Sequence, residues 1–356
     1  MAISPLLRGR KLSNQMGSLH TVGLSSLLRT LDEVLCVVCP LQHLRLVRIM
    51  LYVACDNCGS DETAPVLAGR DLLHGLPGEF TLVRCKVCGL IYQNPQLTRE
   101  EADAYYPTDY EAHIGTRKER LSWLRRIDYR YGVEKRHRAI LRHASVGRML
   151  DVGCATGAFL DGAREHGWIV QGIEPNVNAA NYAREQLGLS VQIASLETAE
   201  LTPDSFDVVT MWNVLEHVPS PSQALARVGE ALRPGGLLVF AVPSTQSVDL
   251  RVFRGYWAGY DVPRHLFVFP PAPLENMVRS SGFQLVCRRC IYGTYHAFVF
   301  SARFAMSDRM RNDTIRLIIA RTMLSLPCRA LMIPPSRVID ALNLGSIMTW
   351  FCRKVE

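Results

Sequence analysis

The chain has 356 residues, of which 48% are hydrophobic and 21% are charged, as in ordinary globular domains. This length allows about two or three domains, and the composition excludes a mostly disordered, collagen-like or coiled-coil chain. No stretch reaches about 18 uncharged apolar residues, so the sequence predicts no transmembrane helix.

The charge is distributed unevenly along the chain. The formal net charge is +7, and residues 116–148 alone hold eleven basic and three acidic side chains. Residues 149–306 hold eleven basic and fourteen acidic side chains. The largest block is therefore slightly acidic, which argues against a broad nucleic-acid-binding face.

Residues 1–49 do not show the pattern of a folded domain. They contain short apolar runs, scattered Ser and Gly, and only Asp32 and Glu33 as acids. An acid-poor, Arg-rich start is typical of a targeting segment, and a docked helix is a second interpretation. Organised sequence begins directly after Met50, which favours a third: an unpacked extension or a mis-assigned start.

Residues 50–100 contain two CxxC pairs, Cys55–Cys58 and Cys85–Cys88, with 26 residues between them. A glycine follows each pair and permits a left-handed turn that points backbone amides at sulfur. Four thiolates suit a closed tetrahedral zinc site of structural type, so we expect a zinc-ribbon domain. The alternatives are two reduced pairs or a disulfide pair. A thiolate site also favours a reducing, cytoplasmic compartment.

Residues 101–145 are aromatic, then basic, and predict a linking helical segment. Between about 118 and 143, apolar side chains recur at helical spacings of three and four, and they are Leu121, Leu124, Ile127 and Tyr131. We expect this stripe to pack on the following domain. The alternative is a lid over a substrate that carries phosphate.

Residues 146–356 alternate between predicted strands and helices. Strands are expected over 148–152, 168–173, 191–194, 206–212, 236–242, 283–289 and 346–354, and helices over 158–166, 177–187, 221–232 and 273–280. Such alternation implies a parallel sheet with helices on both faces. Ligands in this architecture bind beyond the carboxyl ends of the strands.

Residues 307–345 are interpreted as a helical insertion before the last strand. Apolar residues alternate with arginines there, and Pro327, Pro334 and Pro335 are expected to break the segment into short helices. A basic amphipathic helix can lie on an anionic membrane surface, which makes peripheral membrane contact one interpretation. A lid and a dimer contact are the others.

A glycine-containing loop follows the first strand of the sheet, with Asp151 ahead of Gly153 and Gly157. Its G-x-x-x-G spacing differs from the G-x-G-x-x-G of dinucleotide folds. Asp151 would repel a pyrophosphate but suits an ammonium group. Glu174, after the second strand, can accept hydrogen bonds from both hydroxyls of a ribose. A nucleoside with an amino-acid tail and no phosphate fits both positions.

These residues resemble the class I S-adenosylmethionine-dependent methyltransferases over about 147–300. The resemblance rests on the segments LDVGCATGAFL, VQGIEPN, FDVVTMWNVLEHV and LRPGGLLVFAVPS. It implies a doubly wound, Rossmann-like α/β fold with a mostly parallel seven-stranded sheet, and S-adenosylmethionine as the methyl donor.

The same resemblance implies a set of cofactor-binding positions. One group frames the methionine end, Glu174 binds the ribose, a second group flanks the adenine, and a third lies near the reacting sulfonium. Ala155 stands where a third glycine is common in the family. The complete set is Asp151, Gly153, Cys154, Ala155, Gly157, Glu174, Ser195, Leu196, Asn213, Glu216 and His217.

The four-cysteine segment extends the resemblance to a bacterial group with an amino-terminal zinc ribbon. Members of that group are often tied to sugar, polysaccharide or secondary-metabolite modification. Residues 259–269 resemble its substrate-side motif, which places Asp261, Arg264 and His265 on the acceptor side. His265 is a candidate general base, and Arg264 a candidate for holding an anionic acceptor. Alternatively, His265 only orders the loop.

The sequence therefore predicts methyl transfer to a small or carrier-linked metabolite, such as a sugar, a polysaccharide precursor or a secondary metabolite. Two other functions remain open: a nucleic-acid methyltransferase with the ribbon as reader, and a non-catalytic cofactor-binding scaffold. Residues 212–215 read Trp-Asn-Val-Leu, which counts against methylation of exocyclic base nitrogens.

Overall fold

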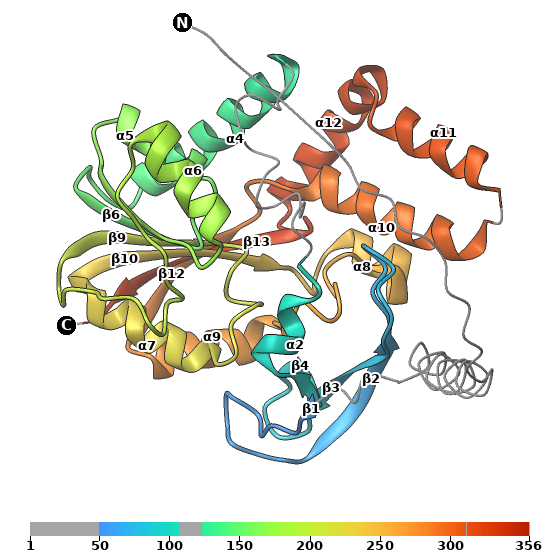
Figure 1. Cartoon of the computed structure of the whole chain (residues 1–356), viewed down its shortest axis with the longest axis horizontal. Coiled ribbons are helices and arrows are strands. Elements are labelled where there is room, and N and C mark those ends of the chain that lie inside the picture. Colours follow the sequence, from blue (N-terminus) through green and yellow to red (C-terminus); the bar gives the residue numbers. More distant parts are fainter. Residues whose placement is uncertain (1–49, 107–122, 311, 356) are drawn as a thin grey trace, which may run out of the picture. The chain divides into compact units, whose positions relative to one another are not determined.

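The computed structural model describes residues 50–106, 123–310 and 312–355, whose elements are labelled in Figure 1. Residues 49–356 form one unit. The predictions for residues 1–49, and for the start of the linking segment at 107–122, lie outside the described residues.

A seven-stranded sheet organises the carboxyl-terminal part of the chain, with the strand order β12-β13-β10-β9-β6-β7-β8. The neighbours from β10 to β8 are parallel, whereas β13 runs antiparallel to β10 and β12. The predicted mostly parallel, doubly wound sheet is confirmed. Its strands are β6 (Arg148–Val152), β7 (Ile169–Ile173), β8 (Val191–Gln192), β9 (Phe206–Trp212), β10 (Leu232–Pro243), β12 (Phe283–Arg289) and β13 (Ile347–Lys354).

Helices cover both faces of this sheet (Figure 1), and consecutive strand residues alternate between them. On β9, Val208 packs in the cluster of Phe159, and Val209 in the cluster of Leu225 and Leu274. A strand that is buried on both faces has a continuous run of apolar residues in its sequence. The covering helices are α4 (Trp123–Leu141), α5 (Ala158–Glu165), α6 (Val177–Leu187), α7 (Pro221–Ala231) and α9 (Pro271–Ser280).

Local sequence sets the ends of α6. The side chain of Asn176 accepts a hydrogen bond from the amide of Ala179, and Gly188 ends the helix with a φ of 62°. A side-chain cap at the start and a left-handed glycine at the end are the preferred helix boundaries. The predicted bounds of α6, β6, β9 and β12 are confirmed.

The amino-terminal part forms a second, antiparallel sheet with the order β11-β4-β3-β2. Its strands are β2 (Thr63–Gly69), β3 (Phe80–Cys85), β4 (Ile91–Gln93) and β11 (Phe267–Val268). The short strands β1 (Met50–Leu51) and β5 (Gln96–Leu97) pair beside it, followed by α2 (Arg99–Asp103). The fourth strand, β11, comes from the segment that the sequence analysis assigned to the substrate side.

The linking helix α4 packs on α5, and Tyr131 is the one residue of the predicted stripe whose side chain lies among those described. Tyr131 is exposed, so its prediction as a packing residue is wrong. The buried positions are instead Val133, His137, Ala139 and Ile140. The phenol ring, with its hydroxyl, tolerates exposure better than an aliphatic side chain does, which accounts for the exposure of Tyr131.

Three helices lie between β12 and β13: α10 (Thr294–Arg309), α11 (Asp313–Met323) and α12 (Leu326–Ala341). The expected break at Pro334 and Pro335 is wrong, because both lie inside α12. Each proline removes one backbone donor, and the residues whose carbonyls lose that donor, Ala330 and Leu331, are exposed, so water can replace it.

Among the described residues, no helix is by itself long and apolar enough to cross a membrane. The segments Thr314–Met323 and Leu326–Ala341 meet the length and composition criteria only as a pair, with a bend of 59° between them. After β10 the chain also forms α8 (Val248–Phe253) and the 3-10 turn η3 (Arg254–Tyr256).

Candidate functional site

Two buried carboxylates lie at the carboxyl ends of the parallel strands β6 and β7. Asp151 Oδ1 accepts a hydrogen bond of 2.6 Å from the hydroxyl of Thr210 on β9. The carboxylate of Glu174 accepts from the backbone amides of Ala155 and Asn176, each at 2.8 Å. The sheet thus brings both sequence-predicted acids to one edge.

Burial raises the pKa of both acids. The pKa of Asp151 rises to about 7, because burial outweighs the Thr210 hydrogen bond and the charge of Arg136. The pKa of Glu174 also rises, since its two amide donors only partly offset burial. A cation close to such a carboxyl favours the charged form, so Asp151 suits an ammonium group of a ligand.

The loop after β6 turns sharply at Gly153 and Gly157, which have φ values of 69° and 75°. These are left-handed conformations that glycine adopts without strain. A Cβ atom on Gly153 would lie 2.5 Å from Cγ2 of Val214. The loop that follows β9 therefore packs directly on this turn. Ala155 also has a positive φ, of 47°.

Cys154 and Leu196 serve packing in this structure. Cys154 is buried, and its sulfur would lie 2.6 Å from a Cβ atom added to Gly172. Leu196 belongs to the main core cluster, whereas its neighbour Ser195 is half-buried and its amide donates to Thr198 Oγ1. The predicted cofactor contacts of these residues stay predictions.

The loops after β9 and before β11 bring Glu216, His217 and His265 together. Each residue offers one ligand-type atom, and these atoms all lie within 4.8 Å of one another. Glu216 is fully buried, and its Oε1 accepts a hydrogen bond of 3.3 Å from Asn213 Nδ2. Within the described part of the chain, its Oε2 has no hydrogen-bond partner.

Backbone carbonyls orient both imidazole rings. His217 Nδ1 lies 3.0 Å from the carbonyl oxygen of Arg264, and His265 Nδ1 lies 2.9 Å from that of Gly259. Because a carbonyl only accepts, each Nδ1 carries a proton and donates it to that oxygen. Burial lowers the pKa of His217 to about 3, which keeps that ring neutral.

Arg264 is buried in a network of ion pairs. Its guanidinium donates to Asp261 at 2.6 and 3.0 Å, to Asp71 at 2.6 Å, and to the carbonyl of Tyr105 at 3.2 Å. Asp71 and Tyr105 belong to the amino-terminal part, so Arg264 fastens the 259–265 loop to it. Its predicted role in holding an anionic acceptor stays a prediction.

The four cysteines of the two CxxC pairs form a compact cluster. The Sγ atoms of Cys55 and Cys88 are 3.4 Å apart, and those of Cys58 and Cys85 are 3.5 Å apart. Both distances are far longer than a disulfide of about 2.0 Å. They are close to the sulfur separation of about 3.8 Å expected from Zn–S bonds of about 2.3 Å in a tetrahedron. The cluster therefore fits a zinc ion.

Residues 123–288 match the family model of a methyltransferase domain. A curated relative, the ubiquinone biosynthesis O-methyltransferase of Burkholderia thailandensis, is 32% identical over 184 residues, covering 48% of this chain and 76% of the relative. The protein of that name from Nitrosococcus oceani is 34% identical over 161 residues, covering 41% and 68%. This chain belongs to the class I S-adenosylmethionine-dependent methyltransferases.

A solved structure of an S-adenosylmethionine-dependent methyltransferase from Mesorhizobium loti is also similar to this methyltransferase. It is 18% identical, has a TM-score of 0.43, and is covered over 97% of its length by 62% of this chain.

The residues at the strand ends fit the cofactor of the methyltransferase family. The pKa of Asp151 is raised because burial disfavours its charged form. An ammonium group close to the carboxylate would stabilise that charged form. Each oxygen of Glu174 accepts one amide and has capacity for a second donor. Glu174 therefore has acceptor capacity for two ribose hydroxyls without loss of the amide hydrogen bonds, and its role in ribose binding stays a prediction.

Arg136 on α4 is a further candidate site residue, which the sequence analysis did not include. Its guanidinium carbon lies 4.9, 5.0 and 5.4 Å from the ring centres of Phe159, Trp212 and Tyr292. This is the range of cation–π contact. The Tyr292 hydroxyl donates to Asn213 at 2.6 Å. Nothing in the sequence separates Arg136 from its basic neighbours; only the packing of α4 does.

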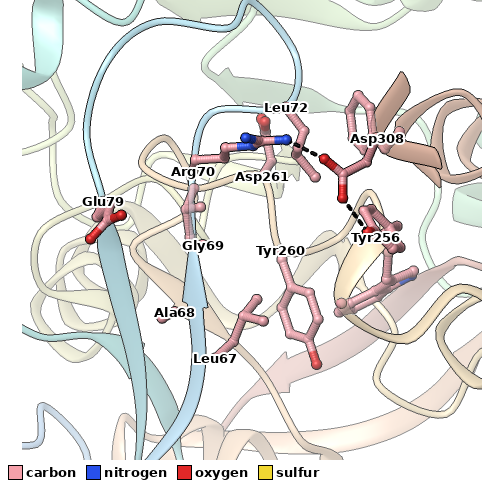
Figure 2. Close-up of a pocket in the computed structure, with 14 residues that line it drawn as sticks. Leu67, Ala68, Gly69, Arg70, Leu72, Glu79, Tyr256, Tyr260, Asp261 and Asp308 are labelled. Atoms are coloured by element: carbon pink, nitrogen blue, oxygen red, sulfur yellow. Dashed lines mark hydrogen bonds and ion pairs between the residues drawn. The ribbon is translucent and has the colours of Figure 1, made fainter. Parts of the chain in front are cut away.

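A cavity of about 480 Å³ lies between β2, the 255–262 loop and α10 of the methyltransferase. Figure 2 shows Arg70 and Tyr256 directed at the carboxylate of Asp308, and Tyr260 also lines the cavity. Asp261 also lines it, so the cavity adjoins the loop that carries Arg264 and His265.

Proposed function

We propose that this methyltransferase transfers a methyl group to a hydroxyl oxygen of a small or carrier-linked metabolite. The observation that carries the proposal is the cluster of Glu216, His217 and His265, whose first two residues are on the same loop as Val214, which packs on the Gly153 turn. It supplies lone pairs and a carboxylate where the acceptor must meet the cofactor. The relatives named as O-methyltransferases support oxygen as the accepting atom; their names give no support to the sugar or polysaccharide class.

In this proposal, side chains from four elements position S-adenosylmethionine, which supplies a methyl group already activated on sulfur. Asp151 holds the ammonium group and Arg136 the carboxylate of the methionine end. Glu174 accepts hydrogen bonds from the ribose hydroxyls. The Asn213 side chain, fixed by Tyr292 and Glu216, supports the wall nearest the reacting centre. Positioning supplies much of the rate when the donor is already reactive.

The cavity beside Asp261 supports a substrate larger than its reacting hydroxyl. Three aromatic residues, Tyr256, Trp257 and Tyr260, line it together with the charged Arg70 and Glu79. We assign it to the part of the acceptor remote from the accepting oxygen. Tyr260→Ala should then raise the KM for the acceptor with little change in cofactor affinity.

The function is tested with the full chain, methyl-labelled S-adenosylmethionine and a panel of acceptors. The panel contains phenols, vicinal diphenols, hydroxylated quinols, sugar nucleotides and RNA. We expect label in the methyl ether of a hydroxylated small molecule. Label in RNA alone would replace the proposal with the nucleic-acid alternative, and cofactor binding without product from any acceptor would support the scaffold alternative.

We also propose that Cys55, Cys58, Cys85 and Cys88 bind one structural zinc ion. All four ligands come from the protein, which leaves no open coordination position for catalysis. The free energy of zinc binding contributes to the folding of such a domain. Cys85→Ser should therefore lose the ion and destabilise the ribbon. Metal analysis of the purified variant checks this, and an unchanged zinc content would contradict it.

We further propose that α11 and α12 contact an anionic membrane surface. Large apolar side chains are exposed along both helices, interleaved with arginines, which is the pattern of an interfacial helix. The segment 312–341 has four arginines against two aspartates. The exposed apolar residues are Ile315, Leu317, Ile318, Leu324, Leu326, Leu331, Ile333 and Val338.

Sedimentation with lipid vesicles tests this surface. The full chain should bind vesicles that contain an anionic lipid and not purely zwitterionic ones, and Leu331→Glu should abolish binding. Ile169→Glu, at an equally exposed apolar position on β7, is the matched control. A dimer in solution that Leu331→Glu dissociates would assign the surface to a second copy of the chain instead.

A further inference from the structure

We propose that Glu216, His217 and His265 form a divalent-cation site, separate from the cysteine cluster, and that the bound cation holds the acceptor hydroxyl. The inference rests on the proposed O-methyl transfer and deepens it. It assigns His265 as a metal ligand instead of a free general base.

The first support is the arrangement of the three side chains. Their ligand-type atoms lie within 4.8 Å of one another, so small side-chain rotations bring all three to bonding distance of one ion. Two consecutive residues supply the carboxylate and one ring, and the 259–265 loop supplies the other. The two ring centres are 4.7 Å apart at an interplanar angle of 75°.

The second support is how the rings are held. Metal-binding histidines usually donate the other ring N–H to a carbonyl or carboxylate, which fixes the tautomer and aims the lone pair. Both rings meet this condition, through the carbonyls of Arg264 and Gly259. Arg264 is itself immobilised by Asp71 and Asp261, so the carbonyl that orients His217 belongs to a rigid segment.

The third support is the unpartnered oxygen of Glu216. Its Oε2 is buried and lacks a hydrogen-bond partner among the described residues, which is a costly state for a carboxyl group. The Nδ2 group of Asn213 holds only the other oxygen. A cation at this point gives Oε2 a partner and accounts for a buried acid beside two imidazole rings.

The donor set narrows the choice of ion. Two imidazoles and one carboxylate suit zinc, manganese, iron or cobalt better than calcium or magnesium. Three protein ligands leave coordination positions open, in contrast to the closed cysteine site. An acceptor hydroxyl can occupy an open position, and a vicinal pair of oxygens can occupy two.

The reaction step follows from this placement. A hydroxyl bound to the cation loses its proton to solvent more easily, because the positive charge stabilises the oxyanion. The oxygen then forms a bond to the methyl carbon while the carbon–sulfur bond breaks, and the bonding pair stays on sulfur. The products are a methyl ether and the neutral thioether of the cofactor, so no oxidant or reductant is needed.

Manganese binding to the full, zinc-loaded chain tests the site without any acceptor. Titration followed by electron paramagnetic resonance should show one tightly bound Mn²⁺ per chain. Glu216→Gln and His265→Ala should each weaken binding by about 100-fold or more, since even outer-shell changes cost 10–100-fold. The control is His166→Ala in the separate Glu134–His137–His166 group, which should leave this binding intact.

Two results would overturn the proposal: no tight Mn²⁺, or a bound ion that only His166→Ala removes. Retained S-adenosylmethionine affinity in His265→Ala shows that the variant is folded. Where an acceptor is found, removal of the bound ion with a chelator should stop turnover. Addition of Mn²⁺, which thiolates bind weakly, should restore it. Turnover that survives chelation but is lost in His265→Ala would make His265 a base. If no acceptor is methylated, the Mn²⁺ titration by itself tests the cation site.

Discussion

Replacing Arg264 by methionine should destabilise the protein more than any change to a surface ion pair. The substitution keeps the apolar stem and removes the guanidinium that joins Asp71 and Asp261. The side chains of Arg264 and Asp71 are both 0% exposed, so no water reaches the carboxylate left behind. We therefore expect Arg264→Met to cost stability first and catalysis second.

The magnitude follows from the burial. Removing one partner of a buried ion pair costs about 3–5 kcal/mol, because the Asp71 carboxylate loses its cation and keeps, among the described residues, only backbone amide donors. For a folded unit of this size that corresponds to a fall in Tm of roughly 10 °C. The control is Arg279→Met, which breaks the exposed pair with Glu275 and should cost less than about 1 kcal/mol.

Urea unfolding with zinc retained measures the difference, and Asp71→Asn completes a double-mutant cycle. Burial raises the pKa of Asp71, but the hydrogen bond and charge of Arg264 outweigh it, so the pKa is lowered overall. A lowered carboxyl pKa adds stability that is present above the unfolded value of about 4 and lost as pH falls. The cost of Arg264→Met should therefore shrink in acid. A variant of wild-type stability with a raised acceptor KM would refute this reasoning and support anion binding by Arg264.

Three further predictions concern the cofactor. The Asp151 carboxyl has a pKa of about 7 without ligand, and an ammonium group favours its charged form, so calorimetry should show that the affinity for S-adenosylmethionine rises with pH through 7. Asp151→Asn should abolish this pH dependence. A wild-type affinity that does not change with pH would contradict the prediction. Arg136→Met should weaken binding by about 1.5–3 kcal/mol, whereas Arg138→Met, exposed on the same helix, should not. Gly153→Val places a side chain against Val214 at a φ of 69° and should prevent binding in an equilibrium assay.

The cofactor side of the site was predictable from sequence because it depends on local signals. Apolar runs of strand length and glycines after them locate β6 and β9. Once the strands are parallel, Asp151, Glu174 and Glu216 must fall at one edge of the sheet. The pattern therefore predicts which residues gather at this edge of the sheet before any packing is known.

The acceptor side depends on contacts between distant segments, which no local pattern reveals. Arg264 meets Asp71 across 193 positions of sequence, and β11 pairs with β4 although it is only two residues long. From the sequence, Arg264 was predicted to hold an anionic acceptor. Its burial against two acids depends on the tertiary fold, which the sequence pattern does not reveal. The same holds for Arg136, which reaches the site only because α4 packs on α5.

These long-range contacts connect the cysteine cluster with the loops that we propose to form the acceptor side. Asp56, between the first two cysteines, accepts hydrogen bonds from Ser220 Oγ at 2.6 Å and from the Ser222 amide at 2.8 Å, at the start of α7. The amino-terminal part also holds β11 and Arg264. The two loops that carry His217 and His265 are thus both fastened to it.

Loss of the ion should therefore uncouple the two halves of the site. Cys58→Ser, at the exposed cysteine, should lower kcat/KM for the acceptor by tenfold or more through a raised KM. The affinity for S-adenosylmethionine should change little, because Asp151 lies on the central sheet and Gly153 and Glu174 directly follow its strands. Initial rates and calorimetry on one preparation separate these effects. Equal losses of cofactor and acceptor binding would show that the ribbon supports the whole fold and has no particular connection to the acceptor.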